Sequence, residues 1–278
     1  MLPEYTAPHD WSAIIANTRN PGAVIAKNVL SSDLLERLNT EIDQYLDQPQ
    51  TPGQPETGRS SYDSFLGHKT IRLHGLISKF PAAGDVIGLA DIVQWATALL
   101  APATGQILLN AGELIQIEPG EGKQQAHRDS DSWPLPLMEN PVIVNAIYAL
   151  DNFTLDNGAT WVAPGTWQWP AEQRAQTADY LRGVMQAGDA LLFRGDLIHR
   201  GGANNSNTRR RALSISYSVP WVRTVENNFL HVTPDAAAAL PDTLQALLGY
   251  RAYDGQVEQA GMLGLYENGD PANALSQH

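Results

Sequence analysis

The chain has 278 residues, 43% of them hydrophobic, and a formal net charge of −12 at pH 7. This length and composition allow a sizeable core, and we expect residues 1–278 to fold as one domain. The acidic balance argues against a nucleic-acid binder, but a few local arginines would be enough to bind a small anion.

The chain contains no cysteine. Disulfides, cysteine nucleophiles, iron–sulfur clusters and thiolate zinc sites are therefore excluded. The first residues lack a basic patch followed by an apolar run, no apolar stretch reaches the ~18 residues of a membrane span, and the last residues do not match a peroxisomal signal. We therefore expect a cytoplasmic protein that does not contact a membrane.

The N-terminal part, about 1–105, is predicted to be helical. Apolar residues at helical spacing predict a helix over 31–48, with Ser32 as its cap, and a second helix over about 89–100. The segment 49–60 is rich in Pro, Gly and polar residues and is expected to form a loop.

The next part, about 106–222, is predicted to be the β core. Short apolar runs separated by turn signals are typical of a sandwich or barrel. The Asn157-Gly158 pair predicts a hairpin between two of these runs, and residues 170–183 are expected to form a short helix. The expected strands cover residues 106–119, 142–150, 159–164, 189–195 and 212–219.

The C-terminal part, 223–278, is predicted to contain one helix near 240–250, with Pro241 in its first turn, and then a tail. The fold expected for the whole chain is mainly β with flanking helices.

Two histidines and an aspartate are candidates for a metal site. His127 and Asp129 form a His-x-Asp pair, and side chains two positions apart point to the same face of an extended strand. His199 follows a distant apolar strand and could complete the set. Two imidazoles and a carboxylate suit iron(II) and leave positions for a bidentate 2-oxoacid and dioxygen. Taken singly, each feature is more often a solvated charge pair or a structural histidine.

A basic run follows His199 at the start of a predicted strand. Arg210 shares one face of that strand with Ala212, Ser214 and Ser216, whereas Arg209 and Arg211 share the other with Leu213, Ile215 and Tyr217. A guanidinium that points into a barrel can bind a carboxylate through two parallel hydrogen bonds. The alternative is a solvated basic turn, which we expect for two of the three arginines.

Four segments between about residues 68 and 230 resemble, in order, the motifs of the phytanoyl-CoA dioxygenase-like oxygenases. QQAHRDSDSWP resembles the family's Q-x-H-x-D segment, and AIYALDNFTLDNGATWVAPGTW its NG and PG segment. GDALLFRGDLIHRGGANNS resembles the segment with the distal histidine, and RRALSISY the closing strand. The resemblance implies a double-stranded β-helix (a cupin-like jelly roll) that uses iron(II), 2-oxoglutarate and dioxygen.

The resemblance also assigns residues. His127, Asp129 and His199 match the family's iron ligands, and Arg210 matches the arginine that binds the far carboxylate of 2-oxoglutarate. Gln125 matches a polar residue that contacts the cosubstrate. Asp129 argues against a halogenase, in which a small residue replaces this carboxylate.

The flanking segments 69–81 and 218–230 are similar to those of a branch that tailors fungal secondary metabolites such as meroterpenoids and alkaloids. This implies a small hydrophobic, polycyclic natural product as substrate and hydroxylation, desaturation, rearrangement or endoperoxidation as the outcome. No acyl-CoA handle is evident in the chain. Members of this branch are often homodimers, and we expect a homodimer here.

Candidates for the substrate pocket are less well defined. For the aromatic candidates, core packing is the alternative, and we expect it for more than half of them. A zinc hydrolase or isomerase and an inactive binding module of the same fold are the rival functions. The candidates are Trp133, Arg72, Phe153, Trp161, Tyr217 and Trp221.

Overall fold

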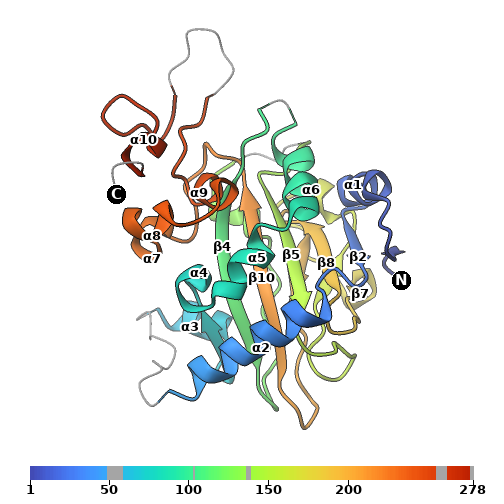
Figure 1. The fold of residues 1–278 in the computed structure, drawn as a ribbon. Helices are drawn as coiled ribbons and strands as arrows, with labels where there is room; N and C mark the ends of the chain where they lie inside the picture. The colour runs from blue at the N-terminus through green and yellow to red at the C-terminus, as the bar shows by residue number, and fades with distance from the viewer. Residues whose placement is uncertain (49–58, 103, 136–138, 255–261, 276–278) are drawn as a thin grey trace.

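A computed structural model describes the chain except for residues 49–58, 103, 136–138, 255–261 and 276–278, so most of the predicted 49–60 loop lies outside the described residues (Figure 1). A seven-stranded sheet dominates the fold. In it, β1 and β2 pair in parallel and the other neighbours pair antiparallel. The strand order is β1 (Glu4–Tyr5), β2 (Ala23–Ala26), β8 (Ala190–Arg194), β5 (Ile143–Ala149), β10 (Arg210–Ser218), β4 (Leu108–Ile117) and β3 (Thr70–Leu73).

A second, three-stranded sheet contains β7 (Leu181–Arg182), β6 (Trp161–Ala163) and β9 (Ile198–Arg200) in that order. Helices flank the sheets, and some of them pack on the large sheet, so the predicted fold class, mainly β with flanking helices, is confirmed. They are α1 (Trp11–Arg19), α2 (Ser32–Leu46), α3 (Ser60–Leu66), α4 (Leu76–Lys79), α5 (Pro81–Ile87), α6 (Ala90–Leu100), α7 (Asn228–His231), α8 (Pro234–Ala238), α9 (Asp242–Leu247) and α10 (Ala272–Leu275).

The main core lies between this helical layer and the large sheet. In Figure 1, α2, α5 and α6 cross one face of the sheet. Leu38 and Ile42 of α2 and Trp95 of α6 are fully buried there against side chains from β4, β5 and β10. The two predicted N-terminal helices are therefore confirmed as α2 and α6. The cap of α2 is Ser31 rather than Ser32, because the hydroxyl of Ser31 accepts the backbone N–H of Leu34.

Strand β10 separates the core from the opposite face of the sheet. Leu213, Ile215 and Tyr217 belong to the helix-side core, whereas Ala212 and Ser214 line a cavity on the other side. This alternation is the one predicted from the sequence, because successive side chains of a strand point to opposite faces. As a result, one face of the large sheet packs against the helices and the other face lines the cavity.

Three other local predictions were wrong. Asn157-Gly158 does not join a hairpin, because β5 belongs to the large sheet and β6 to the small one; the Asn157 side chain instead closes a turn by accepting the N–H of Thr154. Residues 170–183 contain only a 3-10 turn, Thr177–Asp179, before β7. Pro241 precedes α9 as its cap residue instead of lying in the first turn.

In the part of the chain that the structure describes, no single helix is long and apolar enough to cross a membrane. Taken together, the bent pair α5 and α6 reaches the required length and apolar composition.

Candidate metal centre and its cavity

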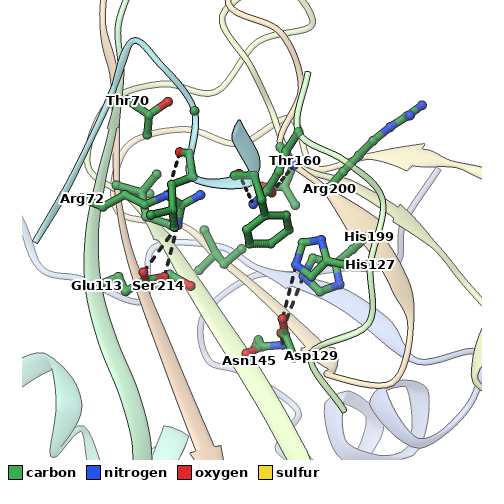
Figure 2. Close-up of a pocket in the computed structure, with 18 of the residues that line it drawn as sticks. Thr70, Arg72, Glu113, His127, Asp129, Asn145, Thr160, His199, Arg200 and Ser214 are labelled. Atoms are coloured by element: carbon green, nitrogen blue, oxygen red, sulfur yellow. Dashed lines mark hydrogen bonds and ion pairs between the residues drawn. The ribbon is translucent and has the colours of Figure 1, made fainter. Parts of the chain in front are cut away.

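A cavity of about 450 Å³ opens on the face of the large sheet that the helical core leaves free. Side chains of β3, β4, β10, β5 and β8 line it, with contributions from α3 and from β9 of the small sheet. This volume lies within the range of small-molecule sites. Figure 2 shows Arg72, Glu113 and Ser214 on one side of the cavity and His127, His199 and Asp129 on the other.

His127, Asp129 and His199 meet at this cavity. Their candidate ligand atoms all lie within 4.8 Å of one another. The Nε2 atom of His127 lies 3.3 Å from Oδ1 of Asp129, and Nε2 of His199 lies 3.6 Å from Oδ2. Arg128 between them is extended, with φ −117° and ψ 135°. Contrary to the prediction, the pair does not lie in a strand, because His127 forms an isolated β-bridge and Asp129 begins a 3-10 turn, Asp129–Ser132.

Backbone pairing holds the two histidines in register. The N–H of His127 donates to the carbonyl of His199 at 3.1 Å, and the N–H of His199 donates back at 2.9 Å. Each ring also places Nδ1 within hydrogen-bond distance of a carbonyl two residues earlier, Gln125 at 3.1 Å and Leu197 at 3.0 Å. In the tautomer in which Nδ1–H donates to this carbonyl, Nε2 has the lone pair that a metal ion requires.

The carboxylate of Asp129 is held in its ionised form. Asn145 donates to its Oδ2 at 2.7 Å. Burial would raise the pKa of Asp129, but His199, His127 and Asn145 outweigh burial and hold it well below its usual range. Burial is also the main reason that the pKa of His199 falls to about 4, which leaves a neutral imidazole. An anionic carboxylate with a neutral imidazole is the state in which both bind metal.

Arg210 is a buried cation in the same cavity. Its side chain lines the cavity, and the residue is only 3% exposed. Its Nη2 donates to the carbonyl of Gly158 at 2.5 Å, and its guanidinium lies 4.2 Å from the Phe153 ring centroid. Its Nε has no hydrogen-bond partner in the part of the chain that the structure describes. Burial and then Arg72 lower its pKa to about 9, against an opposing effect of Asp151. Among the described residues it forms no ion pair, which suits it to bind an anion.

The neighbouring arginines differ from the prediction in part. Arg209 is solvated, as expected, and lies 3.6 Å from Asp43. Arg211 was expected to be solvated and is instead buried. It donates to Asp43 at 2.8 Å, to Asn39 at 3.0 Å and to Gln116 at 2.9 Å, so it connects β10 to α2 and β4.

Gln125 does not line the cavity. Its side chain is exposed, and only its carbonyl is used, as a partner of His127. The adjacent Gln124 lines the cavity instead and accepts the N–H of Gly201 at 3.1 Å. The sequence motif placed a glutamine near the metal but did not distinguish these two neighbours.

Of the six pocket candidates, Arg72 lines the cavity, and the five aromatic residues do not. Trp221 is 44% exposed, and Trp133 donates to the carbonyl of Arg223. Phe153 and Tyr217 are core residues, and the Trp161 ring is in contact with the guanidinium groups of Arg182 and Arg200. Strand alternation places Tyr217 on the face of β10 opposite Arg210. The sequence therefore already indicates that the Tyr217 side chain points away from the cavity.

Several cavity residues were not found from the sequence. Most of them lie on strands whose neighbours cannot be known before the sheet order is known, and Thr160 directly precedes β6. The main ones are Glu113, Asn145, Thr160, Phe193 and Ser214.

A β fold of this topology with a His-Asp-His cluster defines a class of non-haem metal enzymes. The sequence profile of the phytanoyl-CoA dioxygenase family matches residues 18–212, so the chain belongs to that family. This confirms the predicted family, the dioxygenase class, and iron and 2-oxoglutarate as cofactors, and it leaves the zinc-hydrolase and binding-module alternatives without support.

Curated relatives cover nearly the whole chain. The iron/alpha-ketoglutarate-dependent dioxygenase penM of Penicillium thymicola is 29% identical over 260 residues, which span 90% of this chain and 81% of penM. The dioxygenase FrzG of Cladobotryum sp is 30% identical over 264 residues, which span 86% of this chain and 85% of FrzG.

Solved structures share the fold. The alpha-ketoglutarate-dependent epimerase SnoN from nogalamycin biosynthesis has a TM-score of 0.60 at 16% identity and covers 75% of this chain and 80% of its own. The carbocyclase SnoK from the same biosynthesis has a TM-score of 0.60 at 18% identity, with coverages of 78% and 88%. These neighbours confirm the predicted double-stranded β-helix, the cupin-like jelly roll.

Proposed function

We propose that His127, Asp129 and His199 hold the iron(II) of this dioxygenase and that Arg210 binds the distal carboxylate of 2-oxoglutarate. The clustering of the three ligand atoms, with Nε2 of both rings turned towards Asp129, carries the proposal. Bound iron and 2-oxoglutarate together activate dioxygen for the oxidation of an unactivated C–H bond.

The residues of the chain position and isolate this chemistry. Asn145 holds Asp129 so that its carboxylate stays turned towards the two imidazoles. Arg210 offers a desolvated cation for the carboxylate that lies away from the metal. Ile147 and Phe193 give the cavity apolar lining, which would keep water away from the bound reactants. The task of the protein is therefore orientation and exclusion of other hydrogen donors.

We further propose that the substrate is a small hydrophobic natural product, polycyclic in outline. A cavity of about 450 Å³ supports a molecule of that size. SnoN and SnoK, which share the fold, are described as acting in nogalamycin biosynthesis. Hydroxylation, desaturation, rearrangement and endoperoxidation all begin with the same C–H oxidation.

We also propose that the protein is a homodimer. Val225, Phe229 and Leu263 line a second, open cavity of about 560 Å³, and each of these side chains is exposed. Exposed apolar side chains that gather around one cavity mark a candidate protein–protein contact. A second copy of the chain is the proposed cover.

The test of the iron assignment is spectroscopic. Anaerobic addition of iron(II) and then 2-oxoglutarate to the purified protein should produce the visible metal-to-ligand charge-transfer band of a chelated 2-oxoacid. His199→Ala should lose the band, because two ligands bind iron far more weakly than three. In air with ascorbate, the wild type should form succinate slowly and His199→Ala should form none.

The matched control is His68→Ala, because His68 is exposed and outside the cavity. This variant should keep both the band and the succinate. A band of equal strength in His199→Ala would contradict the assignment, as would absence of the band from the iron-loaded wild type.

A further inference from the structure

Glu113 lies in the part of the cavity that is distant from Arg210. On β10, Arg210 and Ser214 are on the same face and four residues apart, which separates their backbones by roughly 13 Å. Ser214 pairs with Glu113 of β4. If the Arg210 end holds the cosubstrate, the Glu113 end is left for the substrate.

The Glu113 carboxylate has acceptor capacity that the protein does not use. Arg72 Nη1 lies 3.3 Å from its Oε2, and His74 Nε2 lies 3.2 Å from its Oε1. An ionised carboxylate has about four acceptor sites. The side chain is 20% exposed, and it lines the cavity, so its remaining lone pairs are open to a ligand there.

A fixed network holds this carboxylate in place. His74 lies between Glu113 and Glu226, 3.2 Å from one and 3.8 Å from the other. Glu226 in turn accepts the N–H groups of Gly75 at 2.7 Å and Gly112 at 2.8 Å. Burial alone would raise the pKa of Glu113, but Arg72 and His74 lower it to about 2. The carboxylate is therefore ionised and has little freedom to turn away.

The charge of Glu113 is already compensated within this network. Glu113 already faces two cations, Arg72 and protonated His74, and Glu226 is shared between the imidazoles of His74 and His231. An ammonium group brought to Glu113 would also meet the two cations. A neutral donor meets no such repulsion, so the network favours a neutral group over a charged one.

Ser214 supplies the complementary group. Side chains directly opposite on antiparallel strands have Cβ atoms about 5 Å apart, so the Ser214 hydroxyl and the Glu113 carboxylate can contact one small group together. Figure 2 shows the two side by side. Within the described part of the chain, the Ser214 side chain has no hydrogen-bond partner. It is half-buried and lines the cavity.

We propose that Glu113 and Ser214 form a specificity site that binds a hydroxyl group of an otherwise apolar substrate. The substrate O–H donates to the Glu113 carboxylate, and its oxygen accepts from the Ser214 hydroxyl. The inference rests on the proposed function, because it places the substrate in the cavity beside the iron. Beyond the proposed function, it specifies that the substrate carries a hydroxyl group and that Glu113 and Ser214 bind this group.

The test uses three rigid bicyclic probes that differ in one group: 2-decalol, 2-decalone and 2-aminodecalin. Binding is measured by calorimetry on protein loaded with redox-inert zinc(II) and 2-oxoglutarate. The wild type should bind 2-decalol about fivefold more tightly than either of the other two probes. Glu113→Gln, which replaces a charged acceptor with a neutral one, should remove most of that preference, and Ser214→Ala should reduce it about threefold.

Glu118→Gln is the matched control, because Glu118 directly follows β4 but does not line the cavity. It should keep the full preference. Equal affinities for 2-decalol and 2-decalone in the wild type would overturn the proposal, and so would failure of 2-decalol to bind up to its solubility limit. An unchanged preference in both Glu113→Gln and Ser214→Ala would also overturn it. The iron assignment fails or stands separately, on the charge-transfer band without any probe.

Discussion

The rings of His127 and His199 are oriented by the same kind of backbone contact. Each ring lies within hydrogen-bond distance, through Nδ1, of the carbonyl two positions earlier, and each is thereby left with Nε2 free on the side of Asp129. The backbone bridge between the two residues fixes the spacing of the rings, whose centroids are 4.2 Å apart. A metal site that is preorganised in this way loses little conformational entropy when the ion binds.

Arg210→Ala should weaken binding of 2-oxoglutarate about 10- to 100-fold, since a hydrogen bond to a charged partner contributes about 1.5–3 kcal/mol. The measurement is titration of the anaerobic charge-transfer band with 2-oxoglutarate. Arg209→Ala is the control, because Arg209 is solvated and adjacent in sequence. Equal affinity in Arg210→Ala and Arg209→Ala would contradict the role proposed for Arg210.

The residues that could be predicted from the sequence are those that carry a motif. His127, Asp129, His199 and Arg210 were selected by residue type, spacing and order, and the structure brings all four to one cavity. Glu113, Asn145 and Ser214 carry no motif. Their proximity depends on the order β5-β10-β4 in the sheet, which is a tertiary property.

At the scale of elements, strand β10 contributes both to the cavity and to the packing of the fold. One face carries Arg210 and Ser214 into the cavity, and the other carries Arg211 into contact with α2. The alternation was predictable, but the burial of Arg211 was not, because only the packing of α2 supplies Asn39 and Asp43 as partners. For the same reason Asn157-Gly158 was misassigned: its turn carries the chain between two sheets.

The contact between His74 and Glu113 should make stability depend on pH. Burial lowers the pKa of His74, but Glu113 and Glu226 outweigh burial and raise it from 6.5 to about 10. Its contribution is therefore fully present below pH 6.5 and is lost as the pH rises through 10. Glu113, lowered from 4.5 to about 2, contributes fully above pH 4.5 and loses its contribution as the pH falls through 2.

The wild type should therefore exceed His74→Gln in free energy of unfolding most clearly between pH 4.5 and 6.5. The difference should fall by about 1 kcal/mol towards pH 10, a value kept small because the His74 side chain is 40% exposed. Urea unfolding of both proteins across this range measures it. A difference that stays constant up to pH 10 would show that the imidazole is not held in its charged form.

At the scale of the whole molecule, the helical layer covers one face of the large sheet and leaves the other for chemistry (Figure 1). The chain carries a net charge of −12, yet one cavity holds Arg210, a buried cation that forms no ion pair among the described residues. An anionic cosubstrate therefore finds its favourable site inside the fold rather than on the acidic surface. The composition indicates that the surface is acidic, but the position of the cavity follows only from the fold.

The exposed apolar patch near the C-terminal helices leads to a prediction about assembly. Leu230, next to Phe229 on α7, is 79% exposed, and Leu263 is 47% exposed. If a second copy covers this patch, Leu230→Glu and Leu263→Glu should each raise the dimer dissociation constant at least tenfold, because each buries a charge in the interface. Sedimentation velocity over a range of protein concentrations measures this constant.

Leu155→Glu is the control, since Leu155 is 68% exposed and does not line the second cavity, and this variant should remain as dimeric as the wild type. A wild type that sediments as a monomer at all concentrations would refute the homodimer, and equal weakening by all three variants would place the interface elsewhere.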